Sequence, residues 1–408
     1  MNAALPPAND ATRPSVLLYC RAGFEDECAK EISALAKTRR APGHARARPG
    51  AGFIEFVTDD PAASAALCRA LDWRRLVFAR QIIATAGWVR ALPPGDRVGA
   101  LLPLIESAGG PFSALWLETA DTNEAKELAA FCRKFRVPLA AALVERRLLD
   151  ESDESLPRLH LFFTGSAAAC VGTTRPGHSS PWPMGIPRLR MAGAAPSRST
   201  MKLAEAIQHW LPADMEREWL HEGVTAVDLG AAPGGWTWQL VQRGVQVTAV
   251  DNGPMQAALM QSGLVEHVRA DGFRYRPRSP VGWMVCDMVE QPKRVAALVA
   301  EWLANGWCER CIFNLKLPMK QRYLELERCR ATLLERCAET GTRWRIEFRQ
   351  LYHDREEVTG YAVREAGGNG TGRRKTSPAR ADQAGNRTSR NHVRRAADLS
   401  RTDGRYRS

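Results

Sequence analysis

Short apolar runs alternate with helix-periodic stretches in the second half of the chain. Because strands that alternate with helices form βαβ units, this order predicts an α/β domain of the Rossmann-like kind with a mostly parallel sheet. A long amphipathic stretch over 319–339 predicts a helix, and runs over 345–352 and 357–363 predict a closing antiparallel hairpin. The five apolar runs of the parallel part are 225–229, 246–250, 265–269, 283–286 and 311–317.

The first half of the chain has a different pattern. An apolar run over 16–20 precedes a helical period over 24–35, and an alternating run follows over 52–57. Between them, the basic segment 37–49 contains two prolines and is predicted to be a loop. The next pattern predicts a second α+β unit, with strands over 80–83, 114–118 and 159–163 and a helix over 122–135.

Proline and glycine crowd the segment between the two halves, which predicts a semi-rigid linker. The last 43 residues contain almost no large apolar side chains, so they cannot bury enough surface to fold alone. The predicted organisation is a flexible extension over 1–14, an α+β unit over 15–75, a second over 76–172, the linker over 173–198, the α/β domain over 199–365 and a disordered basic tail over 366–408.

The charge of the chain is positive but unevenly placed. Its 408 residues have a net charge of +12, and residues 366–408 alone contribute +8 of it. A positive balance favours phosphate-bearing partners, although most of this excess belongs to the tail. No apolar run is long enough to span a membrane, and no secretory signal precedes the first strand, so a cytoplasmic location with reduced thiols is expected. Cys308 and Cys311 have a metal-like spacing but lack partner ligands, so no metal is expected.

A glycine-rich turn follows the first strand of the α/β domain. The strand contains Asp228, and Gly230, Gly234 and Gly235 come next, at the position where this fold class binds a nucleotide. Glycine lacks a Cβ, so a ligand can approach the backbone closely. However, the spacing is not G-x-G-x-x-G and Pro233 removes one amide, so a pyrophosphate cradle is disfavoured. The turn favours a less anionic nucleoside ligand.

Four aspartates stand at the ends of four successive predicted strands: Asp228, Asp251, Asp271 and Asp287. The carboxyl ends of parallel strands meet at one edge of the sheet, where open α/β folds bind ligands. Asp251 lies 23 residues after Asp228, at the spacing of a carboxylate that accepts hydrogen bonds from ribose hydroxyls. Each aspartate could instead be an ordinary helix cap or turn residue. For Asp271, this structural role and the ligand-binding role are equally favoured.

These motifs together resemble a known family. Residues 228–236, 250–255, 283–288, 313–318 and 351–359 are similar to the ribosomal RNA large subunit methyltransferase M family, one of the FtsJ-like ribose 2′-O-methyltransferases. The resemblance implies an S-adenosyl-L-methionine-dependent enzyme that methylates the 2′-hydroxyl of a cytidine in bacterial 23S rRNA. It also implies a ferredoxin-like piece and a THUMP RNA-binding domain in the first half. Ala232 stands where the family commonly has cysteine, and the chain after Arg364 does not resemble the family's C-terminus.

The resemblance further implies a Lys-Asp-Lys-Glu tetrad at Lys202, Asp287, Lys316 and Glu357, with Lys316 as general base. A ribose hydroxyl is a weak acid, so attack on a sulfonium methyl needs a positioned base, and a second ammonium with partial burial would lower the lysine pKa. Without the resemblance, Lys202 and Glu357 would be taken as a surface lysine and an ordinary ion pair. The implied cofactor contacts are Ser199, Ala232, Pro233, Gly234, Gly235, Asp251, Asp271 and Asp287.

Clusters of basic residues predict phosphate contacts with RNA. The resemblance implies that this RNA is 23S rRNA, expected in a protein-poor or precursor form; the sequence leaves the oligomeric state open and favours a monomer. Such contacts give salt-dependent affinity without sequence specificity, and each cluster alone is more often a solvated face. Trp182 could stack on a base or be buried against the neighbouring domain. The clusters are 37–48, 133–136, 146–147 and 188–190 with Arg198.

Two other classes of function remain open at this point. The chain could be an RNA-binding ribosome-assembly factor whose cofactor pocket is inactive or structural. It could also be a nicotinamide-dependent oxidoreductase, although Pro233 and the glycine spacing oppose that.

Overall fold

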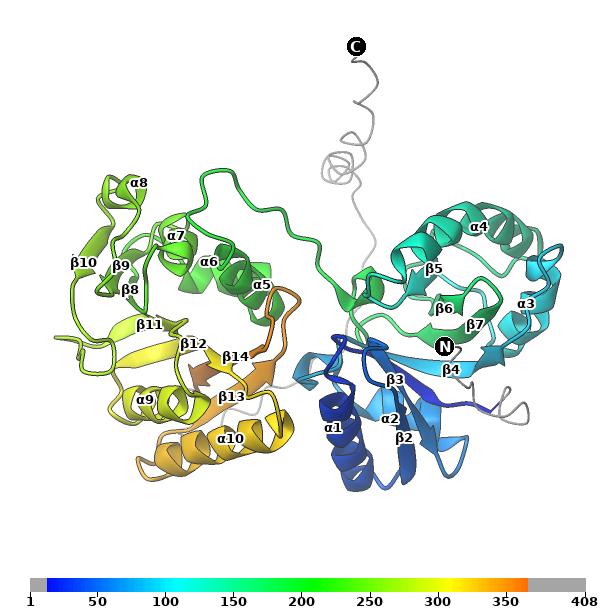
Figure 1. The fold of residues 1–408 in the computed structure, drawn as a ribbon, viewed down its shortest axis with the longest axis horizontal. Coiled ribbons are helices and arrows are strands. Elements are labelled where there is room, and N and C mark those ends of the chain that lie inside the picture. The colour runs from blue at the N-terminus through cyan, green and yellow to red at the C-terminus, as the bar shows by residue number, and fades with distance from the viewer. Residues whose placement is uncertain (1–12, 366–408) are drawn as a thin grey trace, which may run out of the picture. The chain divides into compact units, whose positions relative to one another are not determined.

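The computed structural model describes residues 13–365 (Figure 1). The predictions for residues 1–12 and for the basic tail 366–408 lie outside this described part. Within it, the strands form two seven-stranded sheets, one in each half of the chain. Both sheets mix parallel and antiparallel neighbours.

The sheet of the first half is continuous across the two predicted α+β units. β1 pairs with β3 on one side and with β4 on the other, so strands of both units hydrogen-bond in one ladder. In this sheet only β5 and β6 run parallel. In spatial order, its strands are β2 (Gly43–Ala47), β3 (Phe53–Thr58), β1 (Val16–Tyr19), β4 (Gln81–Val89), β7 (Ala168–Thr174), β6 (Arg158–Gly165) and β5 (Ala114–Thr119).

The helices of this half pack on the sheet through apolar stripes. Phe24, Cys28 and Ile32, at and after the start of α1, are buried against β1 and β3, as the helical period over 24–35 predicts. A separate core lies under α3 and α4 and includes Leu101 and Leu139. The helices are α1 (Glu25–Thr38), α2 (Ala63–Ala70), α3 (Arg97–Ser107) and α4 (Lys126–Glu145), with short 3-10 turns η2 (Trp73–Arg75) and η3 (Pro183–Gly185).

The prediction of a loop over 37–49 was wrong. Residues 43–47 form β2, an edge strand that pairs antiparallel with β3. The arginines and small side chains of 37–49 give only a weak apolar pattern, and the backbone ladder to β3 holds β2 at the edge of the sheet. Gly43 is needed there, since a Cβ would overlap the carbonyl oxygen of Val57. Helix α3 was also missed, and α4 begins later and runs further than the predicted 122–135.

The sheet of the second half confirms the predicted mostly parallel sheet with an antiparallel hairpin. Strands β8 and β9 have the predicted bounds, and β13 and β14 form the closing hairpin. In spatial order, its strands are β10 (Val265–Val268), β9 (Gln246–Val250), β8 (Thr225–Leu229), β11 (Val281–Cys286), β12 (Cys308–Lys316), β14 (Glu357–Arg364) and β13 (Trp344–Arg349).

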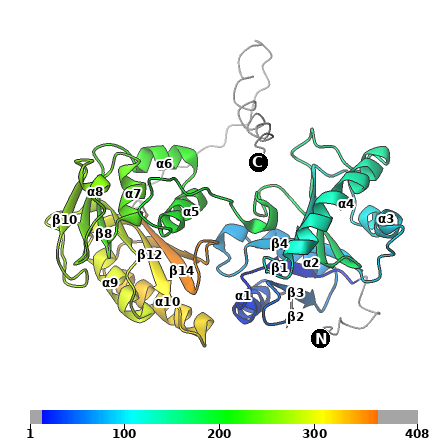
Figure 2. The same ribbon diagram turned by 45° about the horizontal axis from the view of Figure 1, so that its top comes forward.

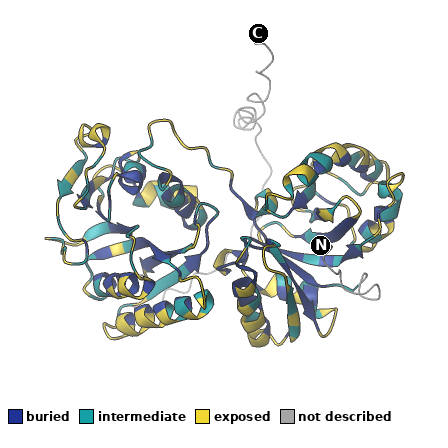
Figure 3. Ribbon diagram, viewed as in Figure 1, coloured by how far each residue is buried: buried dark blue, intermediate teal, exposed yellow. Residues whose placement is uncertain are grey.

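Helices cover both faces of this sheet, as Figure 2 shows for α5 and α7 on one side and α9 and α10 on the other. Alternate residues of each strand enter different cores: Trp283 and Val285 join the core of α5 and α7, whereas Met284 joins that of α9 and α10. The buried strands are visible as dark blue arrows in Figure 3. The helices are α5 (Thr200–Trp210), α6 (Ala213–Trp219), α7 (Gly235–Val241), α8 (Ala257–Met260), α9 (Pro292–Ala304) and α10 (Arg322–Ala338).

None of the helices in residues 13–365 combines the length and the apolar character that crossing a membrane requires.

Candidate active site

The glycine-rich turn joins the end of β8 to α7. Gly230 and Gly234 have φ of +79° and +113°, in the left-handed region that glycine favours. A Cβ at Gly230 would lie 2.6 Å from Cγ of Met288, and one at Gly234 would overlap the side chain of Leu259. The turn therefore requires glycine at both positions and presents bare backbone, as the sequence predicts.

Asp228 supports this turn from beneath. Its side chain is fully buried, and its Oδ2 accepts a 2.6 Å hydrogen bond from Oγ1 of Thr237 in α7. Burial raises the pKa of Asp228 to about 7, and the nearby carboxylate of Asp287 adds to the rise. Asp228 thus connects strand to helix inside the fold and does not face the ligand side of the turn.

Asp251 and Asp271 lie at strand ends as predicted but differ in their surroundings. Oδ2 of Asp251 accepts a 3.0 Å hydrogen bond from the amide of Ala232, and its Oδ1 accepts one of 2.7 Å from Gly253. Asp251 therefore ties the glycine-rich turn to the end of β9 and retains lone pairs for a ribose hydroxyl. Asp271 accepts a bond from the amide of Phe273 and has a side chain that is 51% exposed. That is the geometry of an ordinary turn residue.

Ser199 lies against the turn from the start of α5. Its carbonyl oxygen accepts a 3.1 Å hydrogen bond from Nε1 of Trp236, and its hydroxyl lies 2.7 Å from that of Ser197. A Cβ at Gly235 would overlap the Ser199 hydroxyl oxygen. Ser199, residues 232–235 and Asp251 therefore form one group around the turn.

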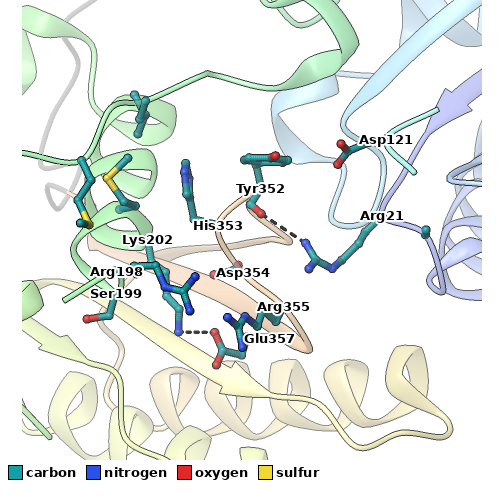
Figure 4. A pocket seen from close by; sticks show the side chains of 14 residues that line it. Arg21, Asp121, Arg198, Ser199, Lys202, Tyr352, His353, Asp354, Arg355 and Glu357 are labelled. Carbon is teal, nitrogen blue, oxygen red and sulfur yellow. Dashed lines mark hydrogen bonds and ion pairs between the residues drawn. The ribbon is translucent and has the colours of Figure 1, made fainter. Parts of the chain in front are cut away.

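The four residues of the expected tetrad come from four separate elements and meet in the structure. Lys202 lies on α5, Asp287 directly follows β11, and Lys316 ends β12 opposite Glu357, the first residue of β14. Nζ of Lys202 lies 3.3 Å from Oδ1 of Asp287. It also forms an ion pair with Oε2 of Glu357 (Figure 4). Nζ of Lys316 lies 3.6 Å from Oε1 of Glu357. Glu357 thus bridges the two lysines.

The two lysines are in different electrostatic environments. Burial lowers the pKa of Lys202, but Asp287 and Glu357 outweigh burial and raise it overall, so Lys202 is a fixed cation. Lys316 has one long contact to a carboxylate, and its side chain is 25% exposed against 13% for Lys202. Burial raises the pKa of Asp287, an effect that Lys202 opposes. Lys316 is therefore the less constrained of the two amines.

A buried network behind the tetrad was missed by the sequence reasoning. Nδ2 of Asn314 donates to Oδ1 of Asp287 at 3.0 Å, and Oγ1 of Thr359 lies 2.7 Å from Oδ1 of Asn314. The same hydroxyl lies 2.9 Å from Oδ2 of Asp354, whose pKa burial raises well above its ordinary value. Asn314 and Thr359 stand two residues from Lys316 and Glu357, on the same face of their strands. The polar Asn314 inside the apolar run of β12 was the feature of the sequence that could have indicated this network.

The loop between β13 and β14 is held by Glu205 of α5. The backbone amides of Tyr352 and His353 donate to Glu205 at 2.8 and 2.9 Å, and Nδ1 of His353 lies 2.6 Å from the same carboxylate. Glu205 is buried, so its two oxygens have a defined set of partners. The helix that carries Lys202 and the loop that precedes Glu357 are thereby fixed to each other.

A cavity of about 880 Å³ opens beside Lys202 and Glu357. Four arginine or lysine side chains line it, from the first half, the linker and the catalytic half: Arg21, Arg198, Lys202 and Arg355 (Figure 4). Arg198 and Arg355 are exposed and have no ion pair within residues 13–365. The cavity beside the tetrad therefore offers unpaired positive charge.

Comparison with known proteins identifies the family. The RlmM ferredoxin-like domain model matches residues 14–83, the model of the N-terminal domain of ribosomal RNA large subunit methyltransferase M matches 96–175, and the FtsJ-like methyltransferase model matches 195–316. A ribosomal RNA large subunit methyltransferase M of Methylococcus capsulatus is 53% identical over 350 residues, 85% of this chain and 97% of that protein. The chain belongs to the ribosomal RNA large subunit methyltransferase M family.

A second member of the family, from Aromatoleum aromaticum, is 50% identical over 366 residues, 90% of this chain and 99% of its own length. The matched models confirm the expected resemblance and the ferredoxin-like unit. The second unit matches the family's own N-terminal domain, and its assignment as a THUMP domain stays a prediction. Lys202, Asp287 and Lys316 lie inside the matched FtsJ-like segment, and Glu357 lies beyond it.

Several of the other candidate residues have structural partners. Trp182 is half-buried, and its ring lies 6.4 Å from that of Trp73. This contact agrees with the interpretation of Trp182 as a packing residue. Among the basic clusters, Arg136 pairs with Glu151 at 3.0 Å. Cys308 and Cys311 are buried in β12. No cluster of three or more potential metal ligands occurs in the described part of the chain.

Proposed function

We propose that the protein is an S-adenosyl-L-methionine-dependent methyltransferase that modifies the ribose 2′-hydroxyl of a cytidine in 23S rRNA. The observation that carries this proposal is the meeting of Lys202, Asp287, Lys316 and Glu357 beside a bare glycine-rich turn. Membership of the family supports the substrate class, because its relatives are named ribosomal RNA large subunit methyltransferases. An RNA substrate also agrees with the unpaired arginines of the adjacent cavity.

The residues around the turn fit a nucleoside cofactor of low negative charge. The backbone of 232–235 would lie against it, with no side chain on Gly234 and Gly235, while Asp251 would accept hydrogen bonds from the ribose. Ser199 would contact it from α5. Asp271 is half-exposed, and its Oδ2 lies 3.7 Å from Nε of Arg274, so it is the most peripheral of the proposed contacts. The bound cofactor supplies an electrophilic methyl group on a sulfonium.

The tetrad supplies the base and its support. Lys316 would accept the proton of the 2′-hydroxyl, so that the hydroxyl oxygen could take the methyl group that the cofactor would supply by breaking its carbon–sulfur bond and leaving as a neutral thioether. Lys202 stays charged and holds Asp287 and Glu357 in place, because it pairs with both carboxylates. Glu357 in turn orients Lys316 across the β12–β14 ladder. Lys316 is therefore the proposed general base, and Lys202, Asp287 and Glu357 position it.

A comparison of rRNA from cells with and without this chain tests the proposal. Mapping of ribose 2′-O-methylation should show one cytidine of 23S rRNA that loses its methyl group in the deletion strain. Return of the methyl group with the wild-type chain, but not with Lys316→Ala, would tie the modification to the tetrad. Cofactor binding by calorimetry with no methyl incorporated into any rRNA would instead favour an assembly factor with an inactive pocket.

A further inference from the structure

The side chain of Tyr352 lies where two neighbouring surface cavities meet, and one of these cavities borders the tetrad. Tyr352 lines the 880 Å³ cavity that Lys202 and Glu357 also line, and it lines a second cavity of about 520 Å³. The two cavities share Ala22 and Asp121 as well, so they are neighbours along one stretch of surface. In Figure 4, Tyr352 stands across the cavity from Lys202 and Glu357.

The ring of Tyr352 is backed by a buried cation. The guanidinium of Arg80 lies 5.3 Å from the ring centroid, and the Arg80 side chain is only 3% exposed. Nη1 of Arg80 is held by Oδ2 of Asp121 at 3.1 Å. A cation held over an aromatic ring is attracted by the ring's electron-rich face. Arg80 and Asp121 therefore fix the plane of the Tyr352 ring.

The backbone of Tyr352 is fixed as firmly as its ring. Its amide donates to Glu205 at 2.8 Å, and its carbonyl oxygen accepts a 3.4 Å hydrogen bond from Nη1 of Arg21. The residue lies on the loop that leads, five positions later, into Glu357. The ring and Glu357 of the tetrad are thus carried by one short, anchored segment, which limits changes in their separation.

We infer that Tyr352 is a stacking platform for an unstacked base of the RNA, next to the ribose that the tetrad acts on. RNA recognition commonly uses splayed bases that stack on aromatic side chains, and a ring fixed in advance loses little entropy on binding. The cavity also presents Arg198 and Arg355 for the phosphates on either side of such a base. This inference rests on the proposed function and adds a positioning residue to it.

Replacement of the ring by an aliphatic side chain tests the inference. Tyr352→Leu should lower kcat/KM for 23S rRNA from deletion cells about 10- to 100-fold, because stacking on an aromatic side chain contributes that much per base. The affinity of Tyr352→Leu for S-adenosyl-L-methionine, measured by calorimetry, should stay within about twofold of wild type. An unchanged affinity would show that the variant is folded. Tyr352→Phe keeps the ring and should recover activity to within about threefold.

The outcomes separate the inference from the proposed function. Tyr275→Leu, a tyrosine that lines a different cavity beside β9 and β10, is the matched control and should methylate like wild type. Full activity of Tyr352→Leu would overturn the platform while leaving the methyltransferase standing. Loss of activity in Tyr352→Phe would overturn it too, because the hydroxyl and not the ring would then be the needed group. A wild-type chain that never methylates 23S rRNA would overturn both proposals.

Discussion

The glycine-rich turn and the tetrad lie at the same edge of one sheet, but they are built in different ways. The turn is local, since residues 228–237 and the nearby strand end at 251–253 make most of it. The tetrad joins residues as far apart as Lys202 and Glu357, from α5, β11, β12 and β14. The turn is thus a property of one segment, whereas the tetrad exists only once the whole sheet has formed. Variants in the two regions should fail in different ways.

The largest expected effect belongs to the tetrad. Lys316→Ala should lower the rate of methyl transfer by about 10²- to 10⁴-fold, the usual contribution of a positioned general base. Cofactor affinity should change little, because Lys316 does not contact the turn. Incorporation of labelled methyl groups and calorimetry would measure the two quantities.

The matched control is Lys320→Ala, an exposed lysine four residues further along the chain. It should methylate rRNA like wild type. If Lys316→Ala kept more than a tenth of wild-type turnover, the base would have to be another group.

The second prediction concerns pH and the support of the turn. Because the folded pKa of Asp228 is about 7 against an ordinary 3.8, the folded state binds more protons than the unfolded state between these values. Stability therefore falls as pH rises through this window. Between pH 5 and pH 7, this titration should lower the unfolding free energy of the wild type by about 2 kcal/mol. Asp228→Asn has no group to titrate at this position and should not show that part of the loss.

Urea unfolding at the two pH values checks this, with Asp214→Asn on the exposed face of α6 as control. The control should show the wild-type pH dependence. An Asp228→Asn variant with an unchanged pH dependence would contradict the raised pKa.

The two regions also differ in how far the sequence could predict them. The bounds of β8 and β9, the glycine-rich turn and the place of Asp251 after β9 follow from local spacing and hydrophobic pattern. The spacing favoured Asp251 as the ribose-binding carboxylate and left Asp271 open, but it could not show which amides fold back onto each carboxylate. That depends on loop conformation, which no periodicity encodes.

The network behind the tetrad was harder to predict for a related reason. Asn314, Thr359 and Asp354 are buried polar residues whose meaning depends on the β12–β14 register. Strand β2 was missed because an edge strand that pairs through its backbone leaves no strong hydrophobic signature. The continuity of the first sheet was missed because the pattern marks β1 and β4 as strands but does not say that they pair with each other. The prediction of the tetrad came from the resemblance to the family, because the pattern of the residues alone does not identify these four positions.

The third prediction tests the turn directly. Gly234→Ala places a Cβ at φ +113° and against Leu259, which costs on the order of 1–2 kcal/mol. If the turn holds the cofactor, affinity for S-adenosyl-L-methionine should fall about tenfold, while turnover at saturating cofactor should change far less. Gly95→Ala, at a glycine with no neighbour within 4 Å, is the control and should leave affinity unchanged. Unchanged affinity in Gly234→Ala would remove the turn from the proposed cofactor site.

The smallest effect should come from the network behind the tetrad. Thr359→Val keeps the shape of the side chain but removes the hydroxyl that bonds Asn314 and Asp354, a loss of about 1 kcal/mol. Because Asn314 then holds Asp287 less firmly, kcat should fall about fivefold with KM for the RNA unchanged. Thr359→Ser restores the hydroxyl and should recover kcat. A fall in melting temperature without any change in kcat would show that the network stabilises the sheet but does not position the tetrad.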